Sequence, residues 1–167
     1  MTLRRFARRI ACRLSLASLA FSAALQAPAM DLAPGSELGP SELAVGPYGM
    51  TAHVTQSGIS NEVLVRQQGS RHLGQVDQSG AGNAVEADQI GDANQYRITQ
   101  SGSDHEIRLL QAGYGNQAFI AQSGSANHVT ASQFGNANVV DIQQGPASPA
   151  LNVQQFGNGL EAKVIQH

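Results

Sequence analysis

The stretch QAGYGNQAFIAQSGSANHVTASQ, residues 111–133, decides the fold because glutamine recurs in it every eleven residues. The same spacing continues on both sides and gives an unbroken series of eleven glutamines. The series is Gln56, Gln67, Gln78, Gln89, Gln100, Gln111, Gln122, Gln133, Gln144, Gln155 and Gln166. A fixed period sustained over this length indicates a repeat architecture rather than a conventional globular core.

Other positions of the unit repeat with the glutamine, which we number as position 0. Position 9 is apolar in all ten units. Position 2 is glycine in nine units: Gly58, Gly69, Gly80, Gly91, Gly102, Gly113, Gly124, Gly135 and Gly157. Position 5 is asparagine in six units: Asn61, Asn83, Asn94, Asn116, Asn127 and Asn138. An eleven-residue period also suits a right-handed helical coil, but the recurrent glycines and β-branched residues disfavour helix.

Positions 5, 7, 9 and 11 lie on one face of an extended strand, whereas positions 6, 8 and 10 lie on the other. Each unit is therefore predicted to be a short strand with asparagine, two apolar side chains and glutamine facing inward. A glycine-containing turn is expected at positions 2 to 4, where positive φ is needed. A buried amide is costly unless it is hydrogen-bonded, and an identical amide in the next rung supplies a partner. The alternative, outward solubilising glutamines, does not require such strict recurrence.

Two observations favour a rung that comprises two units, made of strand, turn, strand and turn. The tripeptide Gln-Ser-Gly occurs in alternate units, beginning at residues 56, 78, 100 and 122. Residues two units apart would then stack directly, and no like charges meet at that offset, whereas an offset of one unit creates two like-charge pairs. Three opposite-charge pairs result: Arg66 with Asp88, Glu86 with Arg108, and Asp141 with Lys163.

The predicted fold is all-β, a β-solenoid with two parallel stacked sheets in a cross-β arrangement. Its five 22-residue rungs span residues 56–77, 78–99, 100–121, 122–143 and 144–167, and stand roughly 24 Å tall. One rung buries about four apolar side chains, roughly 6–12 kcal/mol, against about 30 kcal/mol of ordering cost. Rungs must therefore stack, and the open end rungs predict templated growth by further copies or related chains.

Two features of the repeat depart from its regularity. His72 and His105 occupy the asparagine position and are expected to point inward, so acid pH would charge them and slow assembly. The unit QGPASPALNVQ, residues 144–154, carries Pro146 and Pro149. It is either a modified end that controls growth or attachment, or harmless drift in an outermost rung. Phe134 and Phe156, which are two units apart, are expected to stack beside it.

The segment before the repeat divides into two parts. Residues 1–29 are predicted to be an export signal, because a basic start precedes the apolar LSLASLAFSAAL and an APA site at 27–29; an N-terminal anchor is the alternative. Residues 30–55 contain three prolines and no sustained period, and are predicted to be a flexible leader, either a secretion-recognition segment or a plain linker. The chain from residue 30 has five basic and twelve acidic residues, hence a net charge of −7. That charge disfavours nucleic acid as a partner, and Cys12 leaves with the signal.

The repeat resembles that of the curlins, the subunits of bacterial curli fibres, whose unit reads Q-x-G-x-G-N-x-A-x-x-x-Q. QAGYGNQAFIAQ, residues 111–122, meets every fixed position, and residues 78–89 do so with valine for alanine. Residues 66–94 are more similar to the minor subunit, the nucleator. Pro149 and Leu160 depart from the inward asparagine in the last rung.

The resemblance implies an amyloid protein at the cell surface that templates polymerisation of the major curlin subunit, in adhesion and biofilm formation. It also implies self-association into fibres, and secretion through a dedicated outer-membrane channel with accessory factors. A bulk fibre subunit remains an alternative. No cofactor, metal or small-molecule substrate is expected.

Two further classes are less favoured. Enzymes of the pectate-lyase type share similar rungs, but the acids here are scattered and no catalytic constellation stands out. A monomeric solenoid adhesin or ice-binding protein would need capped ends, and an ice binder a regular outward threonine array that is missing.

Overall fold

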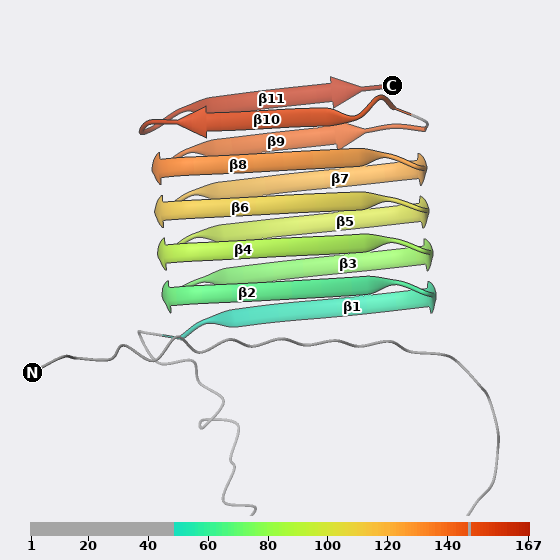
Figure 1. Ribbon diagram of the computed structural model, residues 1–167, viewed down its shortest axis with the longest axis horizontal. Coiled ribbons are helices and arrows are strands. Elements are labelled where there is room, and N and C mark those ends of the chain that lie inside the picture. Colours follow the sequence, from blue (N-terminus) through green and yellow to red (C-terminus); the bar gives the residue numbers. More distant parts are fainter. Residues whose placement is uncertain (1–48, 147) are drawn as a thin grey trace, which may run out of the picture.

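The computed structural model describes residues 49–146 and 148–167, which form a stack of eleven strands (Figure 1). The predicted export signal and residues 30–48 of the leader lie outside the described residues. The strands are β1 (Thr51–Ile59), β2 (Glu62–Ser70), β3 (Leu73–Ala81), β4 (Ala84–Asp92), β5 (Gln95–Ser103), β6 (Glu106–Tyr114), β7 (Gln117–Ser125), β8 (His128–Asn136), β9 (Val139–Gln144), β10 (Leu151–Phe156) and β11 (Glu161–Gln166).

Successive strands alternate between two sheets. The odd-numbered strands form a six-stranded sheet in the order β1-β3-β5-β7-β9-β11, and the even-numbered strands form a five-stranded sheet in the order β2-β4-β6-β8-β10. Every neighbouring pair is parallel, and the pairing offset is two repeat units throughout, as in Gln78 with Gln100 and Gly80 with Gly102. These findings confirm the predicted β-solenoid and its 22-residue rung.

The core lies between the two sheets and consists of inward positions 7 and 9. Side chains alternate between buried and more exposed along the interior strands, as expected for a strand with one face covered. The buried apolar residues are Val63, Val65, Val76, Val85, Ala87, Tyr96, Ile98, Ile107, Leu109, Ala118, Ile120, Val129, Ala131, Val140 and Ile142. The predicted inward face is thus confirmed.

The turns differ from the predicted positions. Each of the first eight strands is nine residues long and continues through position 3, so the turn comprises positions 4 and 5 instead of 2 to 4. The reason is that glycine at position 2 bends the backbone without interrupting the parallel ladder, as at Gly80, which pairs with Gly58 and Gly102. Glycine alone does not mark the turn in this fold.

The first strand begins before the first repeat glutamine. β1 starts at Thr51, and residues 51–55 of the segment expected to be a leader therefore form part of the six-stranded sheet. The ladder that contains Gln56 extends toward the N-terminus because a strand runs from position 6 of one unit to position 3 of the next. This strand accounts for eleven strands where five complete rungs would give ten.

Gly74 and Tyr96 form a complementary pair in the core. Gly74 is the one inward position 7 without an apolar side chain, and a Cβ built there would lie 2.4 Å from Tyr96 Cζ, one rung away. The Tyr96 ring fills this space and is buried. Its hydroxyl has no hydrogen-bond partner among the described residues, and burial raises the pKa of the phenol.

The last rung is irregular, as the two prolines predict. β9, β10 and β11 are six residues long, and the chain between β9 and β10 replaces the regular turn. Pro149 does not take the inward position that the repeat assigns to it: its side chain is exposed and Ser148 is buried instead. The hydrogen bond from Ser148 N to Asn127 Oδ1 (2.8 Å) spans 21 residues, although the strands on both sides of this turn keep the 22-residue offset. The shift of one residue is therefore confined to the turn.

Candidate functional site

Two continuous ladders of glutamine side chains run through the stack. In each step, Nε2 of one glutamine donates to Oε1 of the glutamine 22 residues later, at 2.7–2.9 Å. The first ladder joins Gln56, Gln78, Gln100, Gln122, Gln144 and Gln166, and the second joins Gln67, Gln89, Gln111, Gln133 and Gln155. The structure therefore brings together all eleven glutamines that the sequence singled out.

The interior glutamines also form hydrogen bonds with backbone carbonyls, in addition to those with neighbouring glutamines. Gln111 is fully buried, and its Nε2 donates to Gln133 Oε1 (2.8 Å) and to the Gln95 backbone carbonyl (2.9 Å), while its Oε1 accepts from Gln89 (2.9 Å). Both amide hydrogens and the oxygen are thus used. Such full satisfaction removes the desolvation cost of a buried amide and makes the glutamine depend on rungs above and below.

The turn asparagines form a second set of contacts, which we call the asparagine clamps. Asn116 Nδ2 donates to the Gly135 carbonyl of the next rung (2.9 Å), and Asn116 Oδ1 accepts from the backbone N–H of Asn138 (3.1 Å). The same two contacts with the next rung are made by Asn61, Asn83, Asn94, Asn127 and Asn138. Each clamp joins consecutive rungs at a turn, where the strand ladder is interrupted.

The two histidines replace asparagine in two clamps. His105 is buried; its Nδ1 accepts from the backbone N–H of Asn127 (3.2 Å), and its Nε2 lies 3.2 Å from the Ser101 carbonyl. His72 is also buried and makes equivalent contacts with Asn94 N and Gln68 O. Because Nδ1 must accept and Nε2 must donate, this geometry fits only the neutral imidazole with its proton on Nε2.

The predicted turn glycines permit very close stacking of the backbone. All nine have φ between 96° and 138°, a range that L side chains rarely adopt. At Gly102, an added Cβ would lie 1.9 Å from the Gly124 carbonyl oxygen. Positive φ and close approach are therefore both required in the interior. At Gly157, in the outermost turn, the nearest atom to such a Cβ is Leu160 Cδ1 at 3.5 Å, so only the backbone conformation matters there.

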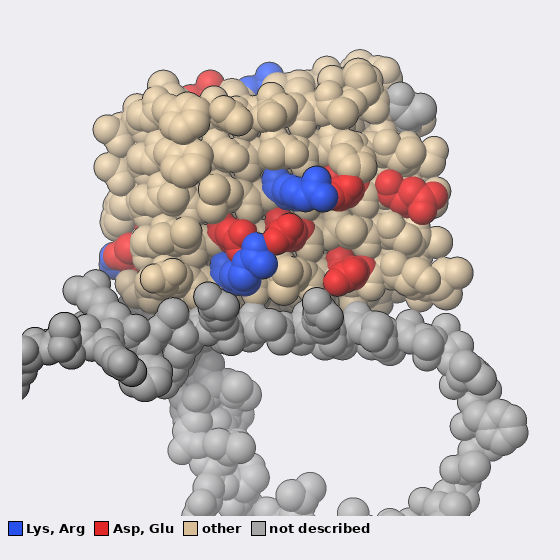
Figure 2. All heavy atoms as spheres, viewed as in Figure 1, with Lys and Arg blue, Asp and Glu red and all other residues tan. Residues whose placement is uncertain are grey.

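Charged side chains gather on the outer face of the five-stranded sheet over β2, β4 and β6, whereas β8 and β10 contain no Asp, Glu, Lys or Arg (Figure 2). Arg66 donates to Asp88 Oδ2 (2.7 Å) and also pairs with Glu86, and these bonds raise the pKa of its guanidinium. Glu86 also lies 4.0 Å from Arg108, and Lys163 lies 3.3 Å from Asp141 on the other sheet. All three charge pairs predicted from the 22-residue offset are thus present.

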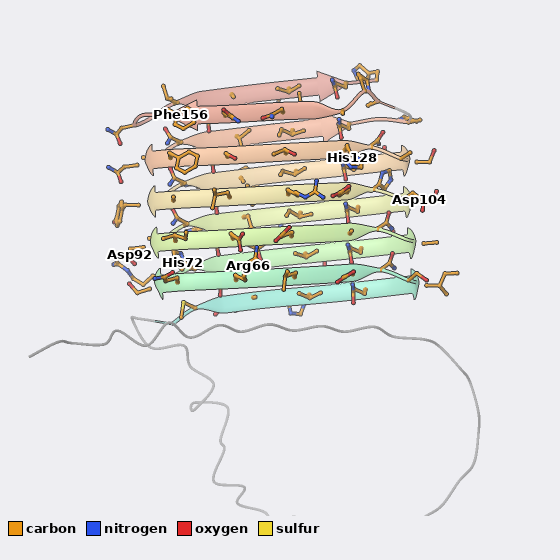
Figure 3. The ribbon with its side chains drawn as sticks, viewed as in Figure 1. Arg66, His72, Asp92, Asp104, His128 and Phe156 are labelled. Carbon is orange, nitrogen blue, oxygen red and sulfur yellow. The ribbon has the colours of Figure 1, made fainter. Side chains whose placement is uncertain are left out.

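The turns on one side carry further polar and aromatic stacking (Figure 3). Asp92 accepts hydrogen bonds from Arg71 Nε (3.0 Å) and Ser70 Oγ (2.6 Å), and the guanidinium of Arg71 lowers the pKa of this carboxyl well below its usual range. Phe156 lies at the C-terminal end of the same side and stacks in parallel on Phe134, with ring centroids 5.1 Å apart. The expected aromatic pair is confirmed.

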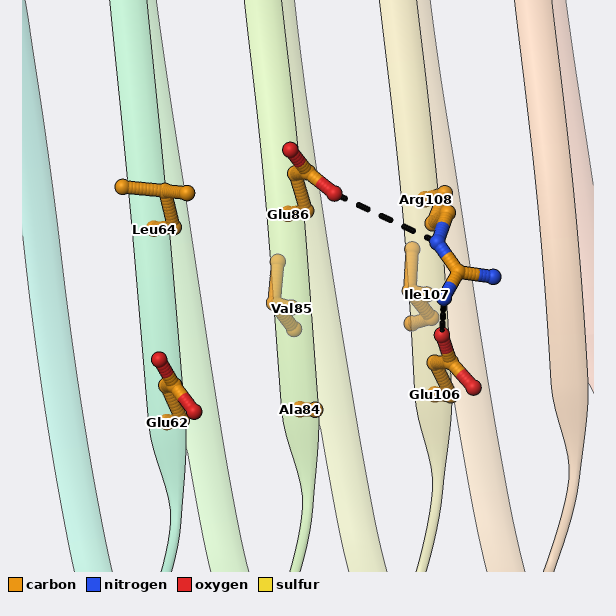
Figure 4. A pocket seen from close by; sticks show the side chains of 8 residues that line it. All are labelled: Glu62, Leu64, Ala84, Val85, Glu86, Glu106, Ile107 and Arg108. Atoms are coloured by element: carbon orange, nitrogen blue, oxygen red, sulfur yellow. Dashed lines mark ion pairs between the residues drawn. The ribbon is translucent and has the colours of Figure 1, made fainter.

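A shallow hollow lies on the charged face between β2, β4 and β6 (Figure 4). Glu62 and Glu106 flank it where Ala84 leaves room, and Arg108 closes one side through its ion pair with Glu106. Its lining residues include no Ser, Cys, Thr, Lys or His that could act as a nucleophile beside a general base. Among the described residues, no group of three or more His, Cys, Asp or Glu side chains could hold a metal ion, and no helix could cross a membrane.

Comparison with known proteins bears on this architecture. Residues 102–135 match the family model of the curlin associated repeat. The matched segment covers the end of β5, all of β6 and β7, and nearly all of β8. No curated protein and no solved structure matches the chain. The match shows that this segment is similar to the curlin associated repeat, and it spans 34 of the 167 residues.

Three features were missed by reading the sequence. Ser148 takes the clamp position that Pro149 vacates; the extra proline before it was the only signal. Tyr96 fills the space beside Gly74. Their 22-residue separation is the signal from which this pairing could have been found. Positive φ was expected at positions 2 to 4, but not that residues other than glycine would adopt it at position 4. These residues are Ser60, Arg71, Ala93, Asp104, Ala126 and Ala137, with φ between 54° and 57°.

Proposed function

We propose that this protein is a structural amyloid subunit of curli-type fibres, and that it acts as a cell-surface nucleator on which the major curlin subunit polymerises. The observation that carries the proposal is the pair of continuous glutamine ladders. Each ladder is periodic along the axis of the stack, and nothing in its chemistry limits it to the rungs of one chain. The curlin repeat match supports the same class of protein.

Self-association follows from the edges of the two sheets. Among the described residues, β1 and β2 have no strand on their N-terminal side, and β10 and β11 have none on their C-terminal side. The inward valine of β1, Val54, is 36% exposed, whereas its partner Val76 in β3 is fully buried. Another rung placed on such an edge would bury apolar surface and complete backbone hydrogen bonds, which favours addition of a further chain.

The nucleator role is favoured over a bulk subunit by the irregular C-terminal rung. A bulk subunit must present two regular, complementary ends so that each copy stacks on the next. In this chain the last rung has short strands, two prolines in its connection and no asparagine at either clamp position. A template needs only one good end. The regular first four rungs, in turn, are what a bulk subunit would also show, so this alternative remains the second candidate.

Export and partners complete the proposal. The predicted signal, residues 1–29, would take the chain to the periplasm, and residues 30–48 with the start of β1 would be recognised by an outer-membrane secretion channel and its accessory factors. The fibre would then lie outside the cell. The mixed charge pairs and the shallow hollow offer no reaction chemistry, and we assign the protein no enzymatic role.

The experiment uses residues 30–167, freshly desalted from denaturant and added at a few per cent to a major curlin subunit that shows a lag. Thioflavin fluorescence is followed, with a chain of scrambled sequence as control. A shortened lag supports nucleation. If the chain forms fibres alone but leaves the lag unchanged, it is a bulk subunit. If it does neither and stays soluble, a monomeric solenoid binder is favoured instead.

A further inference from the structure

The asparagine clamps give the solenoid a direction. Asn83 Nδ2 donates to the Gly102 carbonyl (3.1 Å), and Asn83 Oδ1 accepts from the backbone N–H of His105 (3.2 Å). Both contacts reach the rung on the C-terminal side, and the other clamp asparagines reach in the same direction. Each rung therefore presents asparagine side chains on its C-terminal side, and on its N-terminal side it presents the backbone groups that such side chains contact.

The C-terminal rung has no clamp to extend. Its two clamp positions hold Ser148 and Leu160, which receive the clamps of Asn127 and Asn138 through their backbone N–H groups. The Ser148 hydroxyl turns back to the Gly145 carbonyl of its own turn (3.1 Å). Leu160 offers no polar atom in its side chain and is 40% exposed. A subunit added beyond this rung gains no clamp at either turn.

The N-terminal rung has the opposite character. In each later turn the backbone N–H at position 5 donates to the clamp of the preceding rung. For Asn61 and His72, the first two residues of this kind in the described repeats, no acceptor for that N–H lies among the described residues. The Gly58 carbonyl occupies the position at which Gly80 accepts from Asn61. This end is therefore shaped to receive clamps from a preceding rung.

The glutamine ladders do not distinguish the two ends. Each glutamine that has a later neighbour in its ladder donates to it, so Gln56 and Gln67 present oxygen acceptors at the N-terminal end. At the C-terminal end, Gln166 presents its amide group, and Gln155 donates to the Val139 and Leu160 carbonyls. Head-to-tail stacking keeps the ladders at either end. The clamps, by contrast, are made at one end and are missing at the other.

We propose that the N-terminal end, formed by β1, β2 and the turns at Asn61 and His72, is the preferred docking surface for the next subunit. Its partner is the C-terminal rung of a solenoid chain with the same 22-residue register that keeps asparagine at both clamp positions. A second copy of this chain docks there more weakly, because its own last rung carries Ser148 and Leu160. The inference rests on the proposed function, since it assumes that subunits add end to end.

The test tethers residues 30–167 by one end and measures addition at the other. Cys12 precedes that segment, so one introduced cysteine is its only thiol. Ile59→Cys lies on β1 and Ile165→Cys on β11, the two outermost strands of the same sheet, and both side chains are exposed (59% and 48%). After biotinylation, capture on streptavidin blocks the N-terminal end in the first variant and the C-terminal end in the second.

The soluble probe is the same chain carrying Leu160→Asn, which restores the clamp in the regular turn. The matched control is Leu160→Ala, and far-UV circular dichroism checks that both fold alike. On surfaces tethered through residue 165, we expect the Leu160→Asn chain to add about tenfold faster than the Leu160→Ala chain, because docking gains two hydrogen bonds. The Leu160→Asn chain should also add about tenfold faster to surfaces tethered through residue 165 than to surfaces tethered through residue 59.

Three outcomes would overturn the inference. Equal addition at both ends, or faster addition when residue 59 is tethered, would show that the clamps do not set a preferred end. Equal rates for the Leu160→Asn and Leu160→Ala chains at the N-terminal end would show that the clamp does not contribute to docking. Addition of neither chain at either end would contradict end-to-end assembly itself, and so the proposed function together with this inference.

Discussion

The interior rungs and the end rungs carry the same repeat but have different environments. Gln111 in β6 is fully buried between two glutamines, whereas Gln166 in β11 is half-buried and only accepts, from Gln144. Val76 is fully buried in β3, and Val54 at the same position of β1 is 36% exposed. A side chain at a given repeat position is therefore buried only when a rung lies on each side of it. A rung of another chain can supply the same contacts.

The largest expected difference between interior and end comes from Gln111→Glu compared with Gln166→Glu. A carboxylate at position 111 cannot donate to Gln133 Oε1 or the Gln95 carbonyl, and an unpaired buried charge costs about 3–5 kcal/mol. At position 166 a carboxylate still accepts from Gln144 and meets solvent. Thioflavin-monitored fibre yield at pH 7 should collapse for the first variant and change little for the second.

Acidification gives the control for this pair. Protonation neutralises the carboxylate introduced at position 111 and restores a donor. Measured relative to the unsubstituted chain at the same pH, assembly of the Gln111→Glu variant should therefore partly recover as the pH falls toward 4. Equal yields of the two variants at pH 7 would contradict the interior position of the ladder.

Gly102→Ala compared with Gly157→Ala should give the next largest difference. Both substitutions place a side chain at positive φ, which costs about 1–3 kcal/mol. Only Gly102→Ala also forces Cβ against a backbone oxygen, at 1.9 Å, and such overpacking adds about 1–3 kcal/mol. The guanidinium concentration that dissolves half of the fibres should therefore fall more for Gly102→Ala. Similar midpoints would show that backbone conformation alone selects these glycines.

Most of the interior could be predicted from the sequence because each position is dictated by its copies in the rungs above and below. Glutamine facing inward, the 22-residue offset and the Arg66–Asp88 pairing all follow from that rule, and the structure has all three. The turn was misplaced because glycine at position 2 was taken as a turn signal, although it serves close stacking within the strand. The start of β1 was missed because residues 51–55 precede the first glutamine and have no earlier copy for comparison.

The C-terminal rung shows where this reasoning stops. Two prolines indicated an irregular turn, but not that the buried turn position would move by one residue, from Pro149 to Ser148. The offset is again 22 residues at Leu151, so the shift stays within this turn. Periodicity predicts the buried residue only where the backbone follows the regular turn, and here local packing decides which side chain is buried.

Acid pH should weaken the interior more than the end through the histidines. Nδ1 of His105 accepts from the backbone N–H of Asn127, and it cannot accept there while it carries a proton, so a doubly protonated ring would lose this contact. Losing one buried hydrogen bond costs about 1–3 kcal/mol. We expect assembly to be slower at acid pH than at neutral pH.

His105→Asn and His72→Asn separate the two positions. His105 lies in the interior and contacts the rungs before and after its own, through Asn83 and Asn127. The rung that contains His72 is next to the N-terminal end and can fray without stopping assembly. His105→Asn should remove most of the pH dependence and His72→Asn less. The carboxylates are unchanged in both variants and serve as the internal control. An unchanged pH dependence in the double variant would assign the effect to the ion pairs instead.

The smallest expected effects come from the left-handed residues at position 4. Ala126, between β7 and β8, has φ of 56°, and a left-handed L residue costs about 1–2 kcal/mol. At Gly115, in the same position of another turn, an added Cβ would meet nothing within 4 Å, so conformation rather than space favours glycine there. Ala126→Gly should thus stabilise the fibre by about 0.5–1 kcal/mol after the greater flexibility of the unfolded chain is subtracted.

Ser60→Gly, in the first turn, should give less because that turn is held from one side only. The guanidinium midpoints of the two variants test this order, and a larger gain at residue 60 than at residue 126 would mean that the end rung, not the interior, limits the stability of the stack.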